Sequence, residues 1–175
     1  AETIFFNSEN LKIENDGEII YSSKGTAKIP DQKILIEGDR SIYNKLISEL
    51  IVIGNVKFFD NLNNVYIECE KAIYNQNDNT ILASGETFIK VEDKYQVETK
   101  NVLYNRTTMV IESEQNTSVY DDKNNIYKFE EGFLFDTFKE VVSSKRTNII
   151  DSDNNNYLFE RAKINLLTKE LVGKE

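Results

Sequence analysis

A unit of about thirty residues recurs along this 175-residue chain, and it constrains the fold more than any other feature. Each copy carries an aliphatic residue, an aromatic residue and Asn or Asp in succession, and the aromatic members are Tyr43, Tyr74, Tyr104 and Phe135. These are 31, 30 and 31 residues apart. A fifth copy follows, because Glu160–Asn165 echoes Glu70–Asn75 ninety residues later. A fixed period predicts one supersecondary unit used repeatedly, and such units stack because none buries its apolar face alone.

Within each unit, apolar and polar residues alternate with a period of two. Residues 50–58 and 81–91 both carry aliphatic or aromatic side chains on one phase, with β-branched residues abundant. This is the pattern of strands with one buried face. Turns rich in Asn and Asp separate the runs about every 15 residues, as these residues favour tight turns. We therefore predict a single all-β domain over residues 1–175 with about 11–12 strands.

A finer pattern predicts a corner in each unit. The positions of Ile67, Cys69, Ala72 and Tyr74 are spaced +2, +3 and +2, and they recur at 36–43 and 97–104. Strict alternation would give +2 throughout, so the +3 step predicts a bulge or bend in a tightly rolled sheet. The fourth copy, 127–135, needs one more residue, and the glycines equivalent to Gly54 and Gly85 are missing there. The pattern leaves the register of residues 110–145 open.

Composition excludes several classes of function. Asp and Glu outnumber Lys and Arg by 30 to 21, giving a net charge of −9 without a basic cluster, so we predict no nucleic-acid partner. The same charge disfavours direct adhesion to an anionic leaflet. The chain has no histidine, which removes Ser-His-Asp and Cys-His catalysis. Cys69 is the lone cysteine and is interpreted as a small buried hydrophobe. No apolar stretch approaches the roughly 18 residues of a membrane span.

The remaining candidates for chemistry are weak. The chain has no glycine-rich phosphate loop, and most carboxylates lie on the polar phase or in turns, which argues against a two-carboxylate glycosidase. Asp151–Asn155 resembles the start of a calcium loop, but Asn156 and Ala162 occupy the positions that need Gly and Glu. We interpret that segment as a hairpin turn. The sequence therefore predicts no catalytic residue, no metal site and no cofactor.

The apolar phase carries the remaining functional signal. Side chains on this phase can form a packed core, and this is the interpretation that the residues alone favour. They can also line a groove, because a rolled sheet with many strands encloses more space than its own side chains fill.

The repeat resembles that of the OstA-like domains. The resemblance is carried by Ile67–Asn75 followed by Gly85, and by Ile36–Asn44 followed by Gly54-Asn55-Val56-Lys57-Phe58, and it extends from about residue 13 to the end. These domains form LptA, LptC and the amino-terminal part of LptD. The resemblance implies an open, V-shaped, antiparallel β-jelly roll in the periplasm. It also implies that lipid A acyl chains travel through the apolar interior and that like domains join end to end through edge strands.

The resemblance supplies expected partners and site residues. The partners are lipopolysaccharide, through lipid A, and other OstA-like transport proteins that bind by edge-strand addition. The chain stops mid-strand, which favours the amino-terminal domain of LptD, and a continuing outer-membrane β-barrel would then tether it. Its Ala-Glu start suits a mature exported protein or an arbitrary cut in a longer chain. The residues expected to line the lipid-binding groove are Ile36, Leu50, Val52, Val56, Phe58, Ile67, Ile81, Ala83, Ile89 and Val97.

Two other hypotheses fit the repeat. One is a β-helix that binds carbohydrate or processes polysaccharide, in which parallel strands form short coils. The other is a purely structural repeat with a filled core that binds no lipid. Neither hypothesis rests on a set of catalytic residues that can be recognised in the sequence.

Overall fold

The computed structural model describes residues 2–174, which form one sheet of seventeen strands with two single-turn 3₁₀ helices, η1 and η2. In chain order the elements are β1 (Phe5–Ser8), β2 (Leu11–Glu14), η1 (Asn15–Gly17), β3 (Ile19–Ile29), η2 (Pro30–Gln32), β4 (Ile34–Asn44), β5 (Glu49–Asp60), β6 (Val65–Asn75), β7 (Thr80–Val91), β8 (Tyr95–Asn105), β9 (Val110–Ser113), β10 (Thr117–Tyr120), β11 (Ile126–Phe129), β12 (Phe133–Asp136), β13 (Val141–Ser144), β14 (Thr147–Ile150), β15 (Asn156–Phe159), β16 (Arg161–Asn165) and β17 (Leu171–Lys174).

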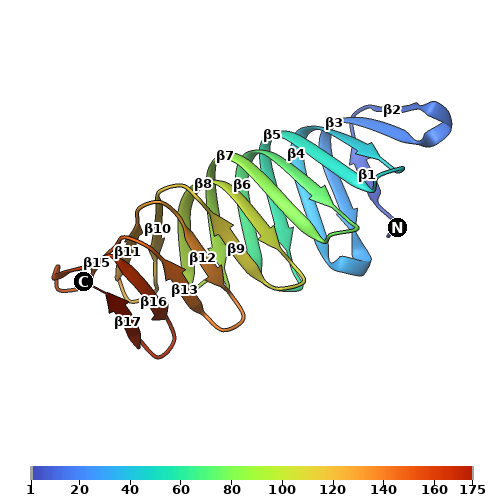
Figure 1. Cartoon of the computed structure of the whole chain (residues 1–175). Coiled ribbons are helices and arrows are strands. Elements are labelled where there is room, and N and C mark those ends of the chain that lie inside the picture. Colours follow the sequence, from blue (N-terminus) through green and yellow to red (C-terminus); the bar gives the residue numbers. More distant parts are fainter. Residues whose placement is uncertain (1, 175) are drawn as a thin grey trace.

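The strands stack into a long prism with the two chain ends at opposite ends of it (Figure 1). Every strand pairing within residues 2–174 is antiparallel. The predicted all-β, antiparallel fold class is confirmed. The parallel coils that a β-helix would need are not what the chain forms, so that hypothesis is wrong about the fold.

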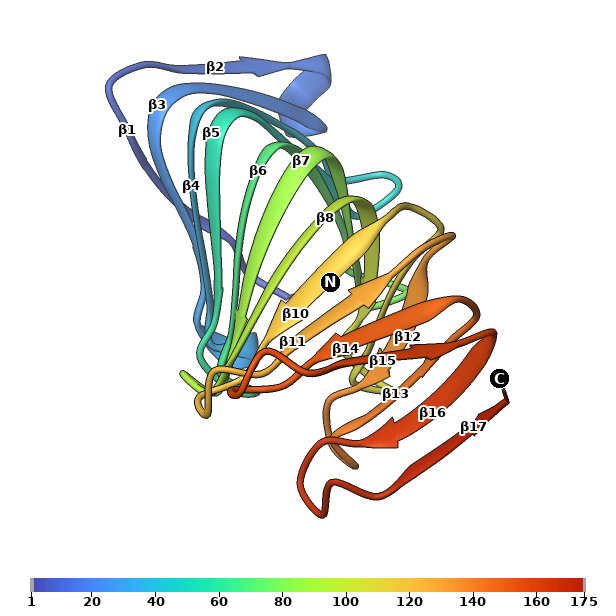
Figure 2. The ribbon, with the colours of Figure 1, turned by 90° about the vertical axis from the view of Figure 1, so that its left-hand side faces the viewer.

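A crease runs along the prism and divides the sheet into two arms. Viewed along the prism, the strands fold over this crease into the two sides of a V (Figure 2). Arm A contains β1, β10, β11, β14 and β15, and arm B contains β2, β9, β12, β13, β16 and β17. Strands β3 to β8 cross the crease and contribute one half to each arm. The turns lie along the free margins of the two arms. These margins meet along a line that we call the seam.

The crease explains why residues 2–174 contain seventeen strands where the sequence predicts about 11–12. Five extended runs are interrupted at the crease, which splits each of them into a pair: β1/β2, β9/β10, β11/β12, β13/β14 and β15/β16. With each pair counted as one run, the chain makes twelve crossings of the prism. The alternation in the sequence predicts these crossings, and the interruptions add the remaining strands.

The predicted corner coincides with the crease. The strand register shifts between Glu37 and Arg40 and again between Glu68 and Lys71, where the sequence places the +3 step. On β5 and β7 the backbone bends through Gly54 (φ +83°) and Gly85 (φ +84°), a region that glycine enters without a Cβ clash. In the fourth copy, Glu130–Gly132 separates β11 from β12. The additional residue of that copy is therefore accommodated in a true break.

The third member of the repeated motif closes the turns of arm B. The side-chain oxygen of Asn75 accepts the backbone N–H of Asp78, and that of Asn105 accepts the N–H groups of Thr107 and Thr108. Asn44, Asp136 and Asn165 make equivalent bonds. These are side-chain-to-backbone turns that satisfy N–H groups no strand can pair. The Asn or Asp of the repeat is therefore a turn residue at the end of its strand.

Candidate functional site: an apolar interior closed by polar clasps

Arm B carries one continuous row of apolar side chains on its inner face. Successive strands place directly opposite one another Ile13, Ile20, Tyr43, Leu50, Tyr74, Ile81, Tyr104, Ile111, Phe135, Val142, Ile164 and Leu171. Residues paired across antiparallel strands share a face. Two successive strands consume about thirty residues, so the recurring aromatic of the sequence falls on every second strand of this row. The repeat in the sequence thus corresponds to the regular spacing of residues along one row.

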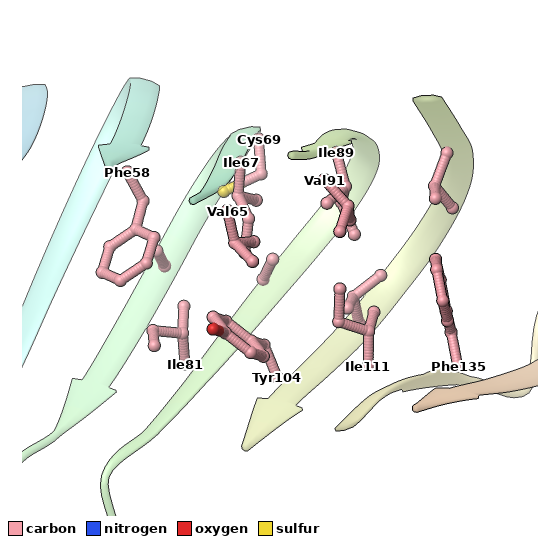
Figure 3. Close-up of a cluster of buried hydrophobic side chains, with 14 of the residues drawn as sticks. Phe58, Val65, Ile67, Cys69, Ile81, Ile89, Val91, Tyr104, Ile111 and Phe135 are labelled. Carbon is pink, nitrogen blue, oxygen red and sulfur yellow. The ribbon is translucent and has the colours of Figure 1, made fainter. Parts of the chain in front are cut away.

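Arm A carries a second row that faces the first. Its members are Phe6, Ala27, Ile36, Phe58, Ile67, Ile89, Val97, Val119, Tyr127, Ile149 and Tyr157. The close-up shows Phe58 and Ile67 above and Ile81, Tyr104 and Phe135 below, pointing toward one another (Figure 3). The two rows form one buried cluster that extends through the prism.

Both rows become exposed where they reach an end of the prism. Ile13 on β2 is 57% exposed, and Tyr157 on β15 is 46% exposed. Between them the rows are nearly inaccessible from Tyr43 to Phe135. The interior is therefore an apolar path that is covered along its length, with an exposed residue at one end of each row.

All ten residues predicted to line a groove lie in the interior. Each is between 0% and 3% exposed. Leu50 and Ile81 belong to the arm B row, and Val52, Val56 and Ala83 lie nearer the crease. The other five belong to the arm A row. In this conformation their own side chains fill the interior, so their role as a lipid-binding groove stays a prediction.

Cys69 is a structural residue at the crease, as its sequence context predicts. It is 7% exposed, and its thiol donates to the backbone carbonyl of Lys71 over 3.4 Å. Burial raises its pKa to about 11. A thiol with so high a pKa is a weak nucleophile at neutral pH.

Polar contacts join the two arms across the seam, and we call each of these contacts a clasp. The best buried clasp joins Asp60, at the arm A end of β5, to Arg106 in an arm B turn. The guanidinium Nε donates to Asp60 Oδ2 over 2.9 Å, and the two side chains are 1% and 0% exposed. Tyr104 also donates to the same oxygen over 2.8 Å, from the arm B row. Removing either charge would leave the other buried without its partner.

Arg106 uses its remaining donors to hold the neighbouring turns. Its Nη1 donates to the side chains of Gln32 and Asn79, and its Nη2 donates to the backbone carbonyl of Gln32. Burial acts to raise the pKa of Asp60, but hydrogen bonds from Arg106, the backbone of Asn63 and Tyr104 outweigh it and lower that pKa. The carboxylate stays ionised at neutral pH, as the geometry of the pair requires.

Two lysine clasps follow toward the carboxy-terminal end. Lys94 of an arm A turn contacts Glu140 of an arm B turn at 2.7 Å, and Lys169 of arm B contacts Asp121 of arm A at 2.8 Å. The lysines are 30% and 38% exposed, against 1% for Arg106. Burial acts to raise the pKa of Asp121, but bonds from Lys169, Asn125 and Lys123 lower it to about 2.

Sequence reasoning missed the clasps. Partners in the three clasps lie 46, 46 and 48 residues apart, which is about one and a half repeats. Alternation within a strand reveals which face a residue occupies, but it does not pair turns on different arms. Pairs of oppositely charged turn residues that recur at this separation are the sequence signal that would have identified the clasps.

The segment from Asp151 to Asn155 is a turn between β14 and β15, as the sequence predicts. The Asp151 carboxylate accepts the backbone N–H groups of Asp153 and Asn155 and the Tyr157 hydroxyl. Within residues 2–174 no group of three or more His, Cys, Asp or Glu is placed to hold a metal ion. The same residues contain no helix that is long and apolar enough to cross a membrane.

This fold is similar to that of a solved periplasmic protein. The match is to LptH, described as the LptA homologous component of the conserved lipopolysaccharide transport device from Pseudomonas aeruginosa. The TM-score is 0.58, the sequence identity is 15%, and the match covers 66% of this chain and 83% of LptH. At this identity the likeness establishes a shared fold. No protein-family model and no curated protein sequence matches the chain.

Proposed function

We propose that this protein is a periplasmic lipopolysaccharide-transport module that shields lipid A acyl chains between its two arms. The observation that carries the proposal is the pair of apolar rows that run through the prism, each of which ends in an exposed residue on one terminal strand, Ile13 on β2 and Tyr157 on β15. The fold shared with LptH supports it, and so does the OstA-like repeat.

The energetics of such a path suit transport. Burying an acyl chain contributes about 0.8 kcal/mol per CH₂ group, so several chains bind well without a polar contact. The middle of both rows carries no charged side chain, so no strong anchor would stop the ligand from moving on. A sugar headgroup would remain in water at the seam or at the ends.

The terminal strands are the proposed docking surfaces for like domains. β1 and β2 form one end of the sheet and β15 and β17 form the other, each paired on one side within residues 2–174. Unpaired edges normally invite association, and here they also carry exposed Phe5, Leu11, Leu158 and Val172. Strand addition at these edges would join the apolar rows of neighbouring domains into one path.

The proposal also covers which OstA-like domain this protein is. We assign it to the bridge that crosses the periplasm toward the outer membrane. The amino-terminal domain of LptD, with a continuing outer-membrane barrel as its tether, stays the predicted family member. A separate LptA-like protein would serve the same physical role, because the two alternatives share the interior and the edges.

Photocrosslinking tests the apolar path against the hypothesis of a filled scaffold. Phe58 lies on the interior row, whereas its neighbour Phe59 faces outward, where its ring lies 4.8 Å from that of Tyr66. A photoreactive phenylalanine analogue replaces either ring with little change in shape. We expect an adduct with lipopolysaccharide from position 58 and none from position 59. A folded variant that gives no adduct at position 58 would return the protein to the scaffold hypothesis.

A charge placed in the interior gives the matching loss-of-binding test. Ile67 is fully buried in the arm A row, and its neighbour Glu68 faces solvent. We expect Ile67→Glu to lose lipopolysaccharide binding, measured in a gradient or pull-down assay on protein that retains its β-sheet spectrum. Glu68→Gln is the matched control and should bind normally. Unchanged binding by folded Ile67→Glu would refute this groove assignment.

A further inference from the structure

The filled interior raises the question of how a bulky ligand reaches it. Phe58, Ile67, Ile81 and Tyr104 are all completely buried, and side chains from both arms contact one another across the prism. A lipid with several acyl chains cannot pass between them unless the arms separate. The two arms meet along two lines, the crease and the seam, and they can move apart only by a change at one or both of these.

Except at the first crossing, β1/β2, the crease is built differently in the two halves of the prism. In the amino-terminal half, β4 to β8 are continuous strands of 11 or 12 residues, although their pairing is interrupted for one to three residues at the corner. In the carboxy-terminal half the crossings break into pairs of four- or five-residue strands, from β9/β10 to β15/β16. A strand that ends at the corner is a natural hinge, whereas a continuous strand resists opening.

The clasps along the seam show the same division independently. The amino-terminal clasp, Asp60–Arg106, is fully buried and is reinforced by Tyr104 and Gln32. The two carboxy-terminal clasps rely on lysines that are about one third exposed. A partly exposed pair is easily exchanged for water, whereas a buried pair that loses its partner is strongly unfavourable.

We propose that the carboxy-terminal half of the prism is a gate that opens along the seam. When Lys94 separates from Glu140 and Lys169 separates from Asp121, the two arms swing apart at the broken crease. The amino-terminal half stays closed around Arg106. An acyl chain then enters sideways through the carboxy-terminal seam and moves along the rows. This inference rests on the proposed function for its ligand, but the opening itself is a property of the protein alone.

Distances between spin labels on opposite turns test the gate directly. One pair, Lys123 and Leu167, spans the carboxy-terminal seam, and a second pair, Asn61 and Thr108, spans the seam beside Arg106. Lys123, Leu167, Asn61 and Thr108 are exposed, and buried Cys69 is replaced by alanine in every sample. Without lipid, we expect a two-component distribution for the first pair and a single narrow one for the second.

Removing the clasps should enlarge the open component. In Lys94→Met/Lys169→Met we expect the long-distance fraction of the carboxy-terminal pair to rise roughly fivefold, with the amino-terminal pair unchanged. Lys94→Arg/Lys169→Arg retains both charges and is the matched control that should stay closed. Equal and unchanged distributions for both label pairs in folded Lys→Met protein would overturn the gate.

Adding lipopolysaccharide separates this inference from the proposed function. We expect the lipid to increase the long-distance fraction of the carboxy-terminal pair in the wild-type background. An adduct at Phe58 without any movement of that pair would overturn the gate and leave the proposed function standing. Opening of the lysine-deleted protein without any lipid adduct would establish the gate and refute the proposed function.

Discussion

The two halves of the prism are built from the same repeat but turn the same corner by different means. In the amino-terminal half, Gly54 and Gly85 take a left-handed conformation, and the strands continue over the crease. In the carboxy-terminal half the strands stop at the corner, where Gly132 has φ +99° within the break between β11 and β12, and side-chain hydroxyls bond to backbone groups there. Ser113 donates to the carbonyl of Lys100, and Ser144 donates to the carbonyl of Gly132.

Under the proposed gate, one sequence period encodes two mechanical behaviours. The rows depend on alternation, which both halves keep, so both halves bury the same kind of interior. Stiffness depends on the few residues at the corner and on the clasp at the seam, which vary from copy to copy. A domain of repeats can therefore be rigid at one end and hinged at the other without losing its continuous core.

Removing the buried clasp is the strongest test of the difference between the two halves. Arg106→Met leaves Asp60 ionised and buried, so we expect it to lower the free energy of unfolding by about 3–5 kcal/mol. Chemical denaturation monitored by circular dichroism measures the change. The double variant Arg106→Met/Asp60→Leu should recover much of the loss. A loss below about 1 kcal/mol for the single variant would mean that the amino-terminal seam is no tighter than an exposed pair.

The corner glycines give the next largest effect. A Cβ at position 54 would lie 2.4 Å from an oxygen of Asp39, whereas at position 85 the nearest atom is 3.6 Å away. Both positions have φ above +80°, which costs an alanine about 1–2 kcal/mol. We expect Gly54→Ala to destabilise more than Gly85→Ala, and both to broaden the amino-terminal label distances. Equal thermal stability of the two variants would contradict the crowding at Asp39.

Acid should test the difference between the two halves by acting on the lysine clasps. Burial acts to raise the pKa of Glu140, but hydrogen bonds from Lys94 and Tyr95 lower it, as similar bonds do for Asp121. The pKa of Asp121 is held at about 2, below the usual value near 4. A lowered pKa stabilises the folded state fully above the usual value, and that contribution is lost as the pH falls through about 2. We expect the carboxy-terminal seam to open progressively between these values, measured by the same label distances. Asp121→Asn should reduce this pH dependence to the contribution of Glu140, and a wild-type profile in that variant would contradict the assignment.

The smallest effect on stability is expected at the docking edge. Val172 on β17 is 74% exposed and Leu158 on β15 is 70% exposed, so lysine at either position should change the free energy of unfolding by less than about 0.5 kcal/mol. Both substitutions should still prevent end-to-end association, because charge on an edge strand disfavours strand addition. Analytical ultracentrifugation measures the association. Lys163→Glu, within the sheet on β16, is a control that should leave association intact.

Much of the fold could be predicted from the sequence because its determinants are local and periodic. Alternation identified the crossings, the +3 step identified the crease, and segments rich in Asn and Asp identified turns. The same alternation placed all ten candidate groove residues in the interior, from Ile36 to Val97. The number of strands was underestimated because a break such as Glu130–Gly132 leaves the apolar phase on both sides intact.

The clasps could not be predicted because they depend on distance in space between turns that are remote in sequence. Asp60 and Arg106 each look like an ordinary charged turn residue when read alone. Only the curvature of the sheet decides that their margins meet and that water is excluded between them. Whether the interior opens depends on the same contacts, so no periodicity of the apolar residues could answer it.

Each complete crossing of the prism adds one side chain to each row, so the length of the molecule grows in regular steps. Strands are about 4.8 Å apart, so the twelve members of the arm B row extend over roughly 50 Å, and one repeat of two strands adds about 10 Å. Gain or loss of a whole repeat would change the reach of the protein in steps of that size. Neither the cross-section of the prism nor the chemistry of its interior would change.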